Sequence, residues 1–223
     1  MANDILFETV NLSKHFAALA AVDDVSLQIR RSTLHAIIGP NGAGKTTLFN
    51  LLSGNLKPTS GKVFYEGNDI TGQPIHRMIH LGIGRSFQIT NVFPNLTVFE
   101  NIRLASQAME KGNFRFLTDA SHLKSCTERA LAVAEKVGLK EKVYSPARML
   151  PHGDQRKLEL GMILAPDPAV LLLDEPTAGM AAEQVPELIS LIREVQADGN
   201  KTVVLVEHNM NVVMSISDTI TVM

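Results

Sequence analysis

The chain has 223 residues, 45% of them hydrophobic and 20% charged, with a formal net charge of −2. These values are typical of a soluble globular protein of one large or two smaller domains, and they give no general argument for nucleic-acid binding. The longest apolar runs are far shorter than the roughly 20 residues that span a bilayer, and the single cysteine, Cys126, excludes an internal disulfide and fits a reducing compartment.

The first part of the chain has an α/β pattern. In one early segment Val25, Leu27 and Ile29 alternate with polar residues, which predicts a half-buried antiparallel edge strand. An alanine-rich turn is expected at 16–21. The expected elements are strands over 5–11, 24–30, 34–38 and 62–65, with helices over 45–53 and 75–81.

A glycine-rich loop follows the strand expected over 34–38 and leads directly into a helix. Strand, loop and helix in this order, with the spacing G-x-x-x-x-G-K-[ST], are typical of a phosphate-binding P-loop. The glycines let backbone N–H groups turn toward a polyphosphate, and the positive end of the helix adds to the attraction. We expect Lys45 to reach the β- and γ-phosphates and the Thr46 hydroxyl to bind Mg²⁺. The candidate binding residues are Gly39, Pro40, Asn41, Gly42, Ala43, Gly44, Lys45, Thr46 and Thr47.

The pattern becomes helical at about residue 89 and returns to α/β after residue 158. Apolar residues recur at helical spacing from Val98, and a second helical run ends at Gly138. We predict a helical subdomain, 89–158, inserted into a nucleotide-binding core formed by 1–88 and 159–223. In the core, the apolar runs at 169–173 and 202–206 predict buried central strands separated by a helix over 185–195, and a further strand is expected at 219–223.

Polar residues with useful chemistry follow these apolar runs. Asp174 and Glu175 come at the carboxyl end of a buried strand, where ligands bind in open parallel sheets. Asp174 is the candidate Mg²⁺ ligand, and Glu175 is the candidate general base that polarises the attacking water. His208 is expected at the same edge, where it can reach a γ-phosphate or orient the water, although a lone histidine is more often structural. The Gln88 amide, at the exit of another core segment, can coordinate Mg²⁺ and sense the motion of the helical subdomain.

Two further patterns have plainer interpretations. His76 and His80 have the spacing of a zinc-binding pair, but Arg77 replaces the glutamate of H-E-x-x-H, so a polar helix face is the favoured interpretation. Cys126 lies four residues after His122 on an expected helix, but no third orienting group accompanies a catalytic Cys–His pair.

Together these segments resemble the ATP-binding subunit of ATP-binding-cassette (ABC) transporters over essentially the whole chain. The resemblance implies a P-loop NTPase (RecA-like) α/β core with an antiparallel β edge and an inserted α-helical subdomain. Phe16 lies where the family places an aromatic ring against adenine. The matching motifs are 39–47 (Walker A), Gln88 (Q-loop), 150–156 (signature), 170–175 (Walker B) and His208 (H-loop).

The segments 98–101, 153–157 and 206–210 are more specifically similar to the ATPases of branched-chain amino-acid importers. Urea or amide importers and a lipopolysaccharide exporter are alternatives, as are a soluble ABC ATPase and a regulatory module without turnover. The resemblance implies ATP and Mg²⁺ as ligands, and a peripheral position on the cytoplasmic face of the inner membrane. Its implied partners are a second ATPase subunit, identical or paralogous, transmembrane permease subunits and, indirectly, a solute-binding protein, with no nucleic acid.

The loop 92–96 is one candidate for contact with the membrane subunits. In the family, coupling helices of the permease dock near the Q-loop, and the apolar residues of this loop suit such a surface. The alternative is a loop folded into its own core, because single apolar residues in loops need no special explanation.

The chain departs from the family pattern at the signature, which usually reads Leu-Ser-Gly-Gly-Gln. Here the residues that would face a partner's ATP are Pro151, His152, Gly153 and Asp154. Pro151 offers neither a hydroxyl nor an N–H, and Asp154 is expected to cap a helix that begins there and to place its charge where phosphate is favoured. The loop 177–181 also has alanine where the family has aspartate or asparagine. From the signature residues we expect the partner's ATP site to be the weaker one, equivalent sites being the alternative. Separately, family members generally continue beyond residue 223.

Overall fold

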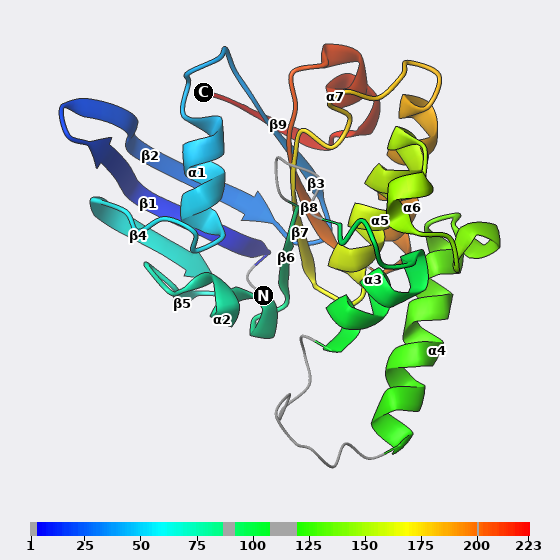
Figure 1. Ribbon diagram of the computed structural model, residues 1–223. Helices are drawn as coiled ribbons and strands as arrows, with labels where there is room; N and C mark the ends of the chain where they lie inside the picture. The colour runs from blue at the N-terminus through cyan, green and yellow to red at the C-terminus, as the bar shows by residue number, and fades with distance from the viewer. Residues whose placement is uncertain (1–3, 87–91, 108–119, 200) are drawn as a thin grey trace. The chain divides into compact units, whose positions relative to one another are not determined.

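The computed structural model describes residues 4–86, 92–107, 120–199 and 201–223, with the side chains of 120–123 left aside (Figure 1). The chain groups into two compact units. The core unit comprises Met1–Arg85, Ala169–Glu175 and Ile192–Met223, and the helical unit comprises Ser86–Pro168 and Pro176–Leu191. Each unit is described by itself. The domain boundaries expected at residues 88 and 158 stay a prediction.

The core unit contains a four-stranded antiparallel sheet in the order β2-β1-β4-β5. Strand β2 lies at the edge of this sheet, and over 24–30 its apolar residues are buried or half-buried while the alternating polar ones are exposed. The predicted edge strand is therefore confirmed. The strands are β1 (Ile5–Phe16), β2 (Leu19–Arg30), β4 (Ser60–Tyr65) and β5 (Asn68–Asp69).

The first two strands are longer than the sequence pattern predicts, and the alanine-rich turn expected at 16–21 is wrong in extent. Phe16 pairs with Leu19, so only two residues form the turn. Ala17 makes this tight turn with a left-handed backbone (φ 52°), and the neighbouring alanines continue the β-ladder instead. A periodicity of two is weak in the Ala-Ala-Leu-Ala-Ala run, which explains the error.

The second sheet of the core unit is parallel, with the strand order β6-β7-β8-β3-β9. Every residue of β7 and β8 is buried, which confirms the prediction of central strands. The P-loop strand β3 lies between β8 and β9, and β9 confirms the strand expected near residue 219. The strands are β6 (Ile83–Arg85), β7 (Val170–Asp174), β8 (Thr202–Val206), β3 (Leu34–Ile38) and β9 (Thr219–Val222).

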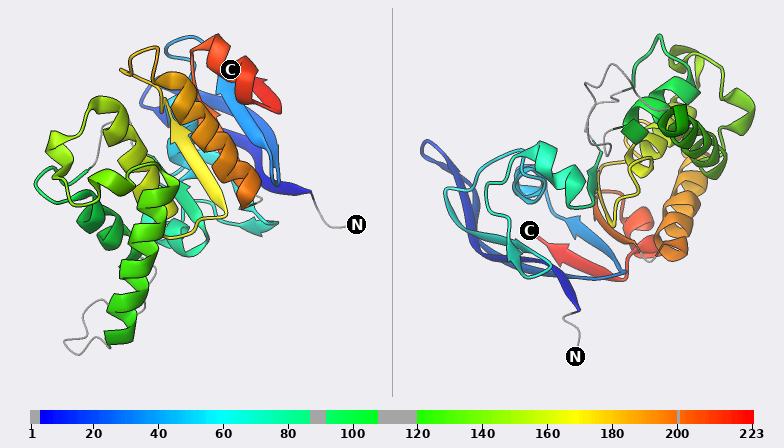
Figure 2. Two further views of the ribbon diagram at one scale, coloured as in Figure 1. Left: turned by 90° about the vertical axis from the view of Figure 1, so that its right-hand side faces the viewer. Right: turned by 90° about the horizontal axis from the view of Figure 1, so that it is seen from below.

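Helix α1 (Lys45–Leu52) packs between the two sheets, as two of the ribbon views show (Figures 1 and 2). Its apolar residues, such as Leu48 and Phe49, join one hydrophobic cluster with residues of both sheets. This packing fixes the helix that begins in the P-loop. The other short helices of the core unit are α2 (Ile75–His80) and α7 (Met210–Ile216).

The helical unit packs three helices against one another: α3 (Val98–Ser106), α4 (Ala120–Lys136) and α5 (His152–Leu164). Helix α3 begins with a capping box, in which the Thr97 hydroxyl and the Glu100 carboxylate each accept an N–H bond from the other residue. Gly138 follows α4 in a left-handed conformation (φ 74°), as expected for a helix stop. The 3-10 turns η2 (Lys140–Lys142) and η3 (Ala147–Met149) precede α5, and α6 (Val185–Asp198) runs from this unit into the core unit.

The expectation that Asp154 caps a helix beginning there is wrong. Helix α5 begins two residues earlier, with Pro151 at its N-cap (φ −55°) and Asp154 inside the first turn. Proline needs no hydrogen-bond partner for its nitrogen, so it suits a helix start.

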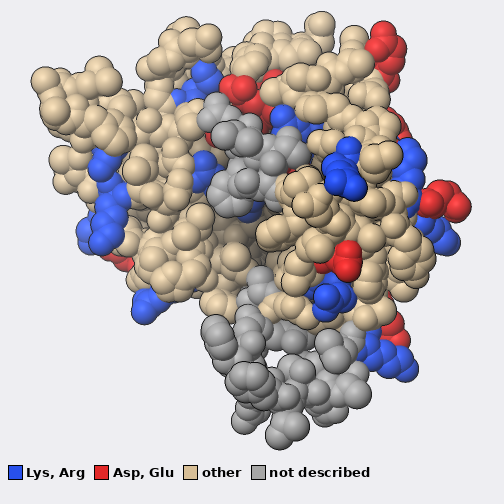
Figure 3. Space-filling model, viewed as in Figure 1, with Lys and Arg blue, Asp and Glu red and all other residues tan. Residues whose placement is uncertain are grey.

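None of the described helices is both long and apolar enough to cross a bilayer. On the face shown in Figure 3, Lys and Arg side chains stand among Asp and Glu side chains.

Candidate functional site

The P-loop connects β3 to α1 and wraps around the side chain of its own lysine. Lys45 is 7% exposed, and its Nζ donates to the carbonyl oxygens of Gly39 (2.8 Å) and Pro40 (2.9 Å). Gly44 caps α1 in a left-handed conformation (φ 91°), and a Cβ there would lie 2.1 Å from the carbonyl oxygen of Ala21. The first turn of α1 carries no acidic side chain in the described chain. The loop therefore presents a cationic end to a polyphosphate.

Asp174 ends the central strand β7 with a carboxylate that is almost wholly buried, at 2% exposure. Burial raises the pKa of this carboxyl, whereas the charges of Arg85 and Lys45 lower it and that of Glu175 raises it. Arg85, on the neighbouring strand β6, donates from Nη1 to the Ser53 hydroxyl at the end of α1. Burial lowers the pKa of this guanidinium, and the negative charge of Asp174 acts in the opposite direction by raising it. The sequence analysis did not identify Arg85. The pattern that could have indicated it is a charged residue within a short strand of the core.

Glu175 and His208 lie side by side at the carboxyl ends of β7 and β8. The Nδ1 of His208 is 3.3 Å from Oε1 of Glu175, and the glutamate side chain is 23% exposed. Glu175 has a left-handed backbone (φ 49°), and its N–H donates to the carbonyl oxygen of Val206 at 2.9 Å. A non-glycine residue in this conformation is uncommon and is often found at functional sites. The turn directs the Glu175 carboxylate toward the imidazole.

The loop that carries His208 is held by its two neighbours. The Glu207 carboxylate accepts bonds from the N–H groups of His208 (3.1 Å) and Asn209 (3.3 Å), and Glu207 is only 1% exposed. The Asn209 side chain caps α7 by accepting from the N–H of Asn211. Sequence reasoning did not single out Glu207. The pattern that could have indicated Glu207 is a carboxylate directly after four consecutive apolar residues, 203–206.

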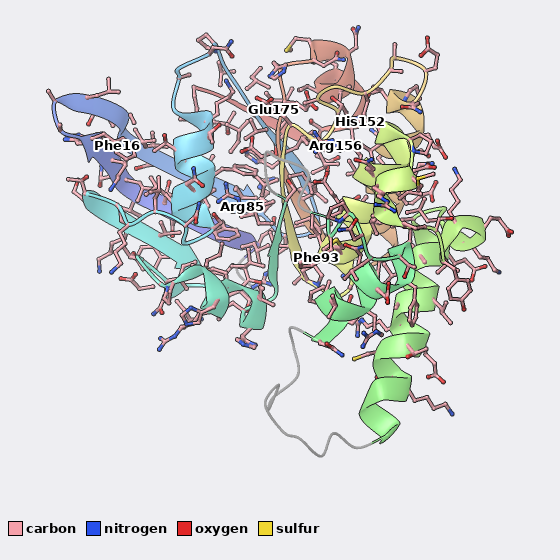
Figure 4. The ribbon with its side chains drawn as sticks, viewed as in Figure 1. Phe16, Arg85, Phe93, His152, Arg156 and Glu175 are labelled. Atoms are coloured by element: carbon pink, nitrogen blue, oxygen red, sulfur yellow. The ribbon has the colours of Figure 1, made fainter. Side chains whose placement is uncertain are left out.

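The remaining predicted residues are not all brought together. Phe16 ends β1 and is 45% exposed, with the Lys14 ammonium 5.2 Å from its ring centroid (Figure 4). Gln88 lies outside the described residues, so its expected roles stay predictions. His76 and His80 stand on α2, and no group of three or more His, Cys, Asp or Glu side chains fit for a metal occurs in the described part of the chain. Cys126 is buried, whereas the side chain of His122 is not described.

The arrangement fits Mg²⁺ by the chemistry of its donors. Thr46 lies in the first turn of α1, and Asp174 ends the strand against which α1 packs, so a hydroxyl and a buried carboxylate are available in the core unit. Hard oxygen donors of this kind are those that Mg²⁺ prefers. Because an ionised carboxylate is costly to bury, a divalent cation beside Asp174 would stabilise its charged form.

The segment 150–154 belongs to the helical unit. Pro151 has no N–H, and His152 is the first helical residue, with an exposed side chain. The Asp154 carboxylate pairs with Lys142 and lies 3.7 Å from the Nζ of Lys157, so two lysines compensate its charge. Asp154 is therefore anchored within its own unit.

The loop 92–96 is held by a buried asparagine. Asn101, which is 0% exposed, accepts a bond from the N–H of Phe93 (2.8 Å) and donates to the carbonyl oxygens of Phe93 and Thr97. The Phe93 ring itself is 53% exposed (Figure 4). Val92 and Leu96 of the same loop are half-buried, so the alternative of a loop folded into its own core also stays open. Its contact with membrane subunits stays a prediction.

Comparison with known proteins agrees with this site. The family model described as ABC transporter matches residues 22–178. The high-affinity branched-chain amino acid transport ATP-binding protein LivG of Salmonella typhimurium is 39% identical over 94% of this chain and 84% of its own length. The corresponding protein BraF of Pseudomonas aeruginosa is 37% identical over 97% and 87%.

Solved structures of ATP-binding cassettes have the same fold. The ADP conformation of MJ1267, an ATP-binding cassette of an ABC transporter, has a TM-score of 0.85 at 28% identity and covers 99% of this chain and 88% of that chain. The dimeric post-hydrolysis state of the cassette MJ0796, bound to ADP and Pi, has a TM-score of 0.78 at 25% identity, with 93% and 90% covered.

Proposed function

The chain belongs to the ABC transporter family of ATP-hydrolysing cassettes, and we propose that it powers the import of branched-chain or related amino acids through separate membrane subunits. One observation carries the proposal for this chain. The P-loop, Asp174, Glu175 and His208 all lie at the carboxyl ends of strands of one parallel sheet, and the last two are in contact. The substrate class rests on the printed names of the relatives.

Binding of ATP is assigned to the loop 39–47 and its lysine. The backbone N–H groups at the start of α1 and the Lys45 ammonium hold the phosphates. Phe16 packs against the adenine ring, which contributes about 1–3 kcal/mol with little selectivity for the base. Thr46, Asp174 and Gln88 hold Mg²⁺, which supplies charge neutralisation on the phosphate oxygens when bound.

Hydrolysis is assigned to the contacting pair at the carboxyl ends of β7 and β8. Glu175 orients a water and accepts its proton as the water oxygen bonds to the γ-phosphorus and the bond to the bridging oxygen breaks. His208 donates from its imidazole toward the γ-phosphate and holds the Glu175 carboxylate in place. The Glu207 carboxylate keeps the N–H groups of this loop in position.

The proposed assembly contains a second ATPase subunit, permease subunits and, indirectly, a solute-binding protein. The chain is placed peripherally on the cytoplasmic face of the membrane. The exposed Phe93 loop supports contact with a permease, because its backbone is fixed by Asn101 while its ring stays accessible. The segment 151–154 faces the ATP of the second subunit.

We further propose that the ATP site served by this chain's segment 151–154 is the weaker of the two. Pro151 cannot supply a hydroxyl or N–H to a phosphate, and one such bond to a charged group is worth about 1.5–3 kcal/mol. The charge of Asp154 is compensated by Lys142 and Lys157, so the missing donor at Pro151 is the main defect.

The test is ATP turnover and leucine uptake by the transporter assembled with its membrane subunits. Glu175→Gln is expected to lower turnover by at least about 100-fold while ATP binding is retained, because the general base is lost. The exposed Glu141 supplies the control Glu141→Gln, which leaves turnover unchanged. If hydrolysis barely falls in Glu175→Gln, this chain's site is not the main one. Uptake of urea or an amide instead of leucine would reject the substrate class.

A further inference from the structure

The loop that follows Glu175 is fastened to the first turns of α5 inside the helical unit. This post-β7 loop comprises residues 176–184. It starts directly after the proposed general base, and α5 carries segment 151–154 at its N-terminus. Three contacts join the loop and the helix. One of them comes from Arg156, a side chain that the proposed function has not used.

The first contact is made by Arg156, whose side chain is only 10% exposed. Its Nη2 donates to the carbonyl oxygen of Ala178 at 3.2 Å, and its Nη1 donates to the Glu159 carboxylate at 2.7 Å. The Glu159 side chain is 12% exposed, so the guanidinium and its counter-charge are buried together. Two separate nitrogens of one planar fork are thus engaged, which fixes the orientation of the guanidinium.

The other two contacts depend on close packing at glycines. Gly179 has a left-handed backbone (φ 75°), and a Cβ there would lie 3.4 Å from Cε1 of the His152 ring. A Cβ on Gly153 would lie 2.8 Å from the Gln184 side chain. The post-β7 loop therefore lies against the first turns of the helix at Ala178 and Gly179 and again at its last residue, Gln184. Figure 4 labels His152 and Arg156 on the same helix.

We propose that Arg156 is a positioning residue for ATP hydrolysis, which fixes the chain leaving Glu175 by holding the Ala178 carbonyl against α5. The inference rests on the proposed function, because it assigns Glu175 the role of general base. Ala178 is three residues beyond Glu175, whose left-handed backbone leaves little freedom to absorb a displacement of the loop. A small displacement of a reacting group costs rate without weakening substrate binding.

The contact also gives segment 151–154 a physical connection to the turn after Glu175. His152 and Gly153 contact the loop at one side and belong to the segment proposed to face the second subunit's ATP. A bound nucleotide that moves this segment moves the loop as well, as long as Arg156 holds the two together. Arg156 is thereby expected to contribute to cooperativity between the two ATP sites.

The experiment compares Arg156→Met and Arg156→Lys in the assembled transporter. Methionine keeps the apolar length and removes both donors, whereas lysine keeps the charge and one donor toward Ala178 or Glu159. Arg129→Met is the matched control, because Arg129 pairs with Asp167 (3.7 Å) in the same unit. ATP affinity, kcat, KM and the Hill coefficient are measured, together with amide hydrogen exchange of residues 177–180.

We expect Arg156→Met to lower kcat by about 10- to 100-fold, with ATP affinity unchanged and the Hill coefficient closer to one. Arg156→Lys recovers part of kcat, and residues 177–180 exchange faster only in the Arg156 variants. An unchanged kcat, or a loss no larger than in Arg129→Met, overturns the inference. If the wild-type transporter does not hydrolyse ATP, the proposed function fails. Unchanged exchange at 177–180 overturns the role of Arg156 independently.

Discussion

Two glycines of the P-loop have the same backbone conformation but different surroundings. Replacing each of them by alanine distinguishes the stability cost of a left-handed backbone from the cost of a steric overlap. Gly42 (φ 85°) and Gly44 (φ 91°) both have left-handed backbones. A Cβ at Gly42 meets nothing within 4 Å, whereas a Cβ at Gly44 lies 2.1 Å from the carbonyl oxygen of Ala21, where ordinary contact begins at 3.4 Å. The loss of unfolding free energy in Gly42→Ala therefore reports the backbone conformation alone. The loss in Gly44→Ala reports the backbone conformation together with the steric overlap.

The expected magnitudes follow from these two terms. A left-handed alanine costs about 1–2 kcal/mol, which both variants share. Overpacking adds roughly 1–3 kcal/mol in Gly44→Ala alone, because β2 must move to accommodate the methyl group. For a chain of this size, 1 kcal/mol corresponds to about 2–4 °C in Tm. The Tm of Gly44→Ala is therefore expected to lie roughly 2–12 °C below that of Gly42→Ala.

The assay is thermal unfolding without nucleotide, followed by circular dichroism and repeated by urea titration. Omitting nucleotide matters, because both glycines belong to the binding loop and ligand binding would shift Tm by mass action. Equal losses of stability in the two variants would refute the reasoning, since the contact with Ala21 would then not be what requires glycine at Gly44. A greater loss in Gly42→Ala would refute it more strongly.

Three further predictions concern local features. Burial lowers the pKa of His35, which hydrogen-bonds Thr219 and Thr221. Its stabilising contribution is therefore present above pH 6.5 and is lost as pH falls from 6.5 through the lower folded-state pKa. Urea unfolding between pH 7.5 and 5 measures this loss, and His35→Gln is expected to reduce the pH dependence. Thr97→Ala removes the cap of α3 and should cost about 1 kcal/mol, and an unchanged urea midpoint would contradict the capping box. Asp174→Asn is expected to raise the Mg²⁺ concentration for half-maximal ATP turnover by at least about 10-fold, whereas equal Mg²⁺ dependence would remove Asp174 from the metal site.

The sequence predicted those parts of the fold that depend on local patterns. The runs 170–173 and 203–206 are wholly apolar, so their burial on both faces follows from composition. The proximity of Glu175 and His208 also follows from topology, because adjacent parallel strands end at one edge of a sheet. The alternation in β2 predicted its edge position for the same kind of reason.

The errors and omissions concern contacts between distant residues. Asp154 has the residue type of a cap, but Lys142 and Lys157 take its charge, and Pro151 sets the helix start two residues earlier. The Arg156 contact with Ala178 spans 22 residues, so no local pattern indicates it. Such contacts depend on how loops pack after the elements have formed, which hydrophobic periodicity does not report.

The P-loop, the turn at Glu175 and the loop around His208 are held in similar ways. This similarity explains how functional groups on loops can keep a fixed position. Each functional group lies one or two residues beyond a buried strand or at the start of a helix, and a local backbone feature fixes it there. Gly44 fits the P-loop against Ala21, the left-handed turn of Glu175 is closed by a bond to Val206, and Glu207 binds the N–H groups around His208. Because each of these devices acts on the functional residue or on its immediate neighbour, the strands supply placement and the loops supply orientation. Substitutions at the neighbours of the reacting groups should therefore lower turnover almost as much as substitutions of the groups themselves.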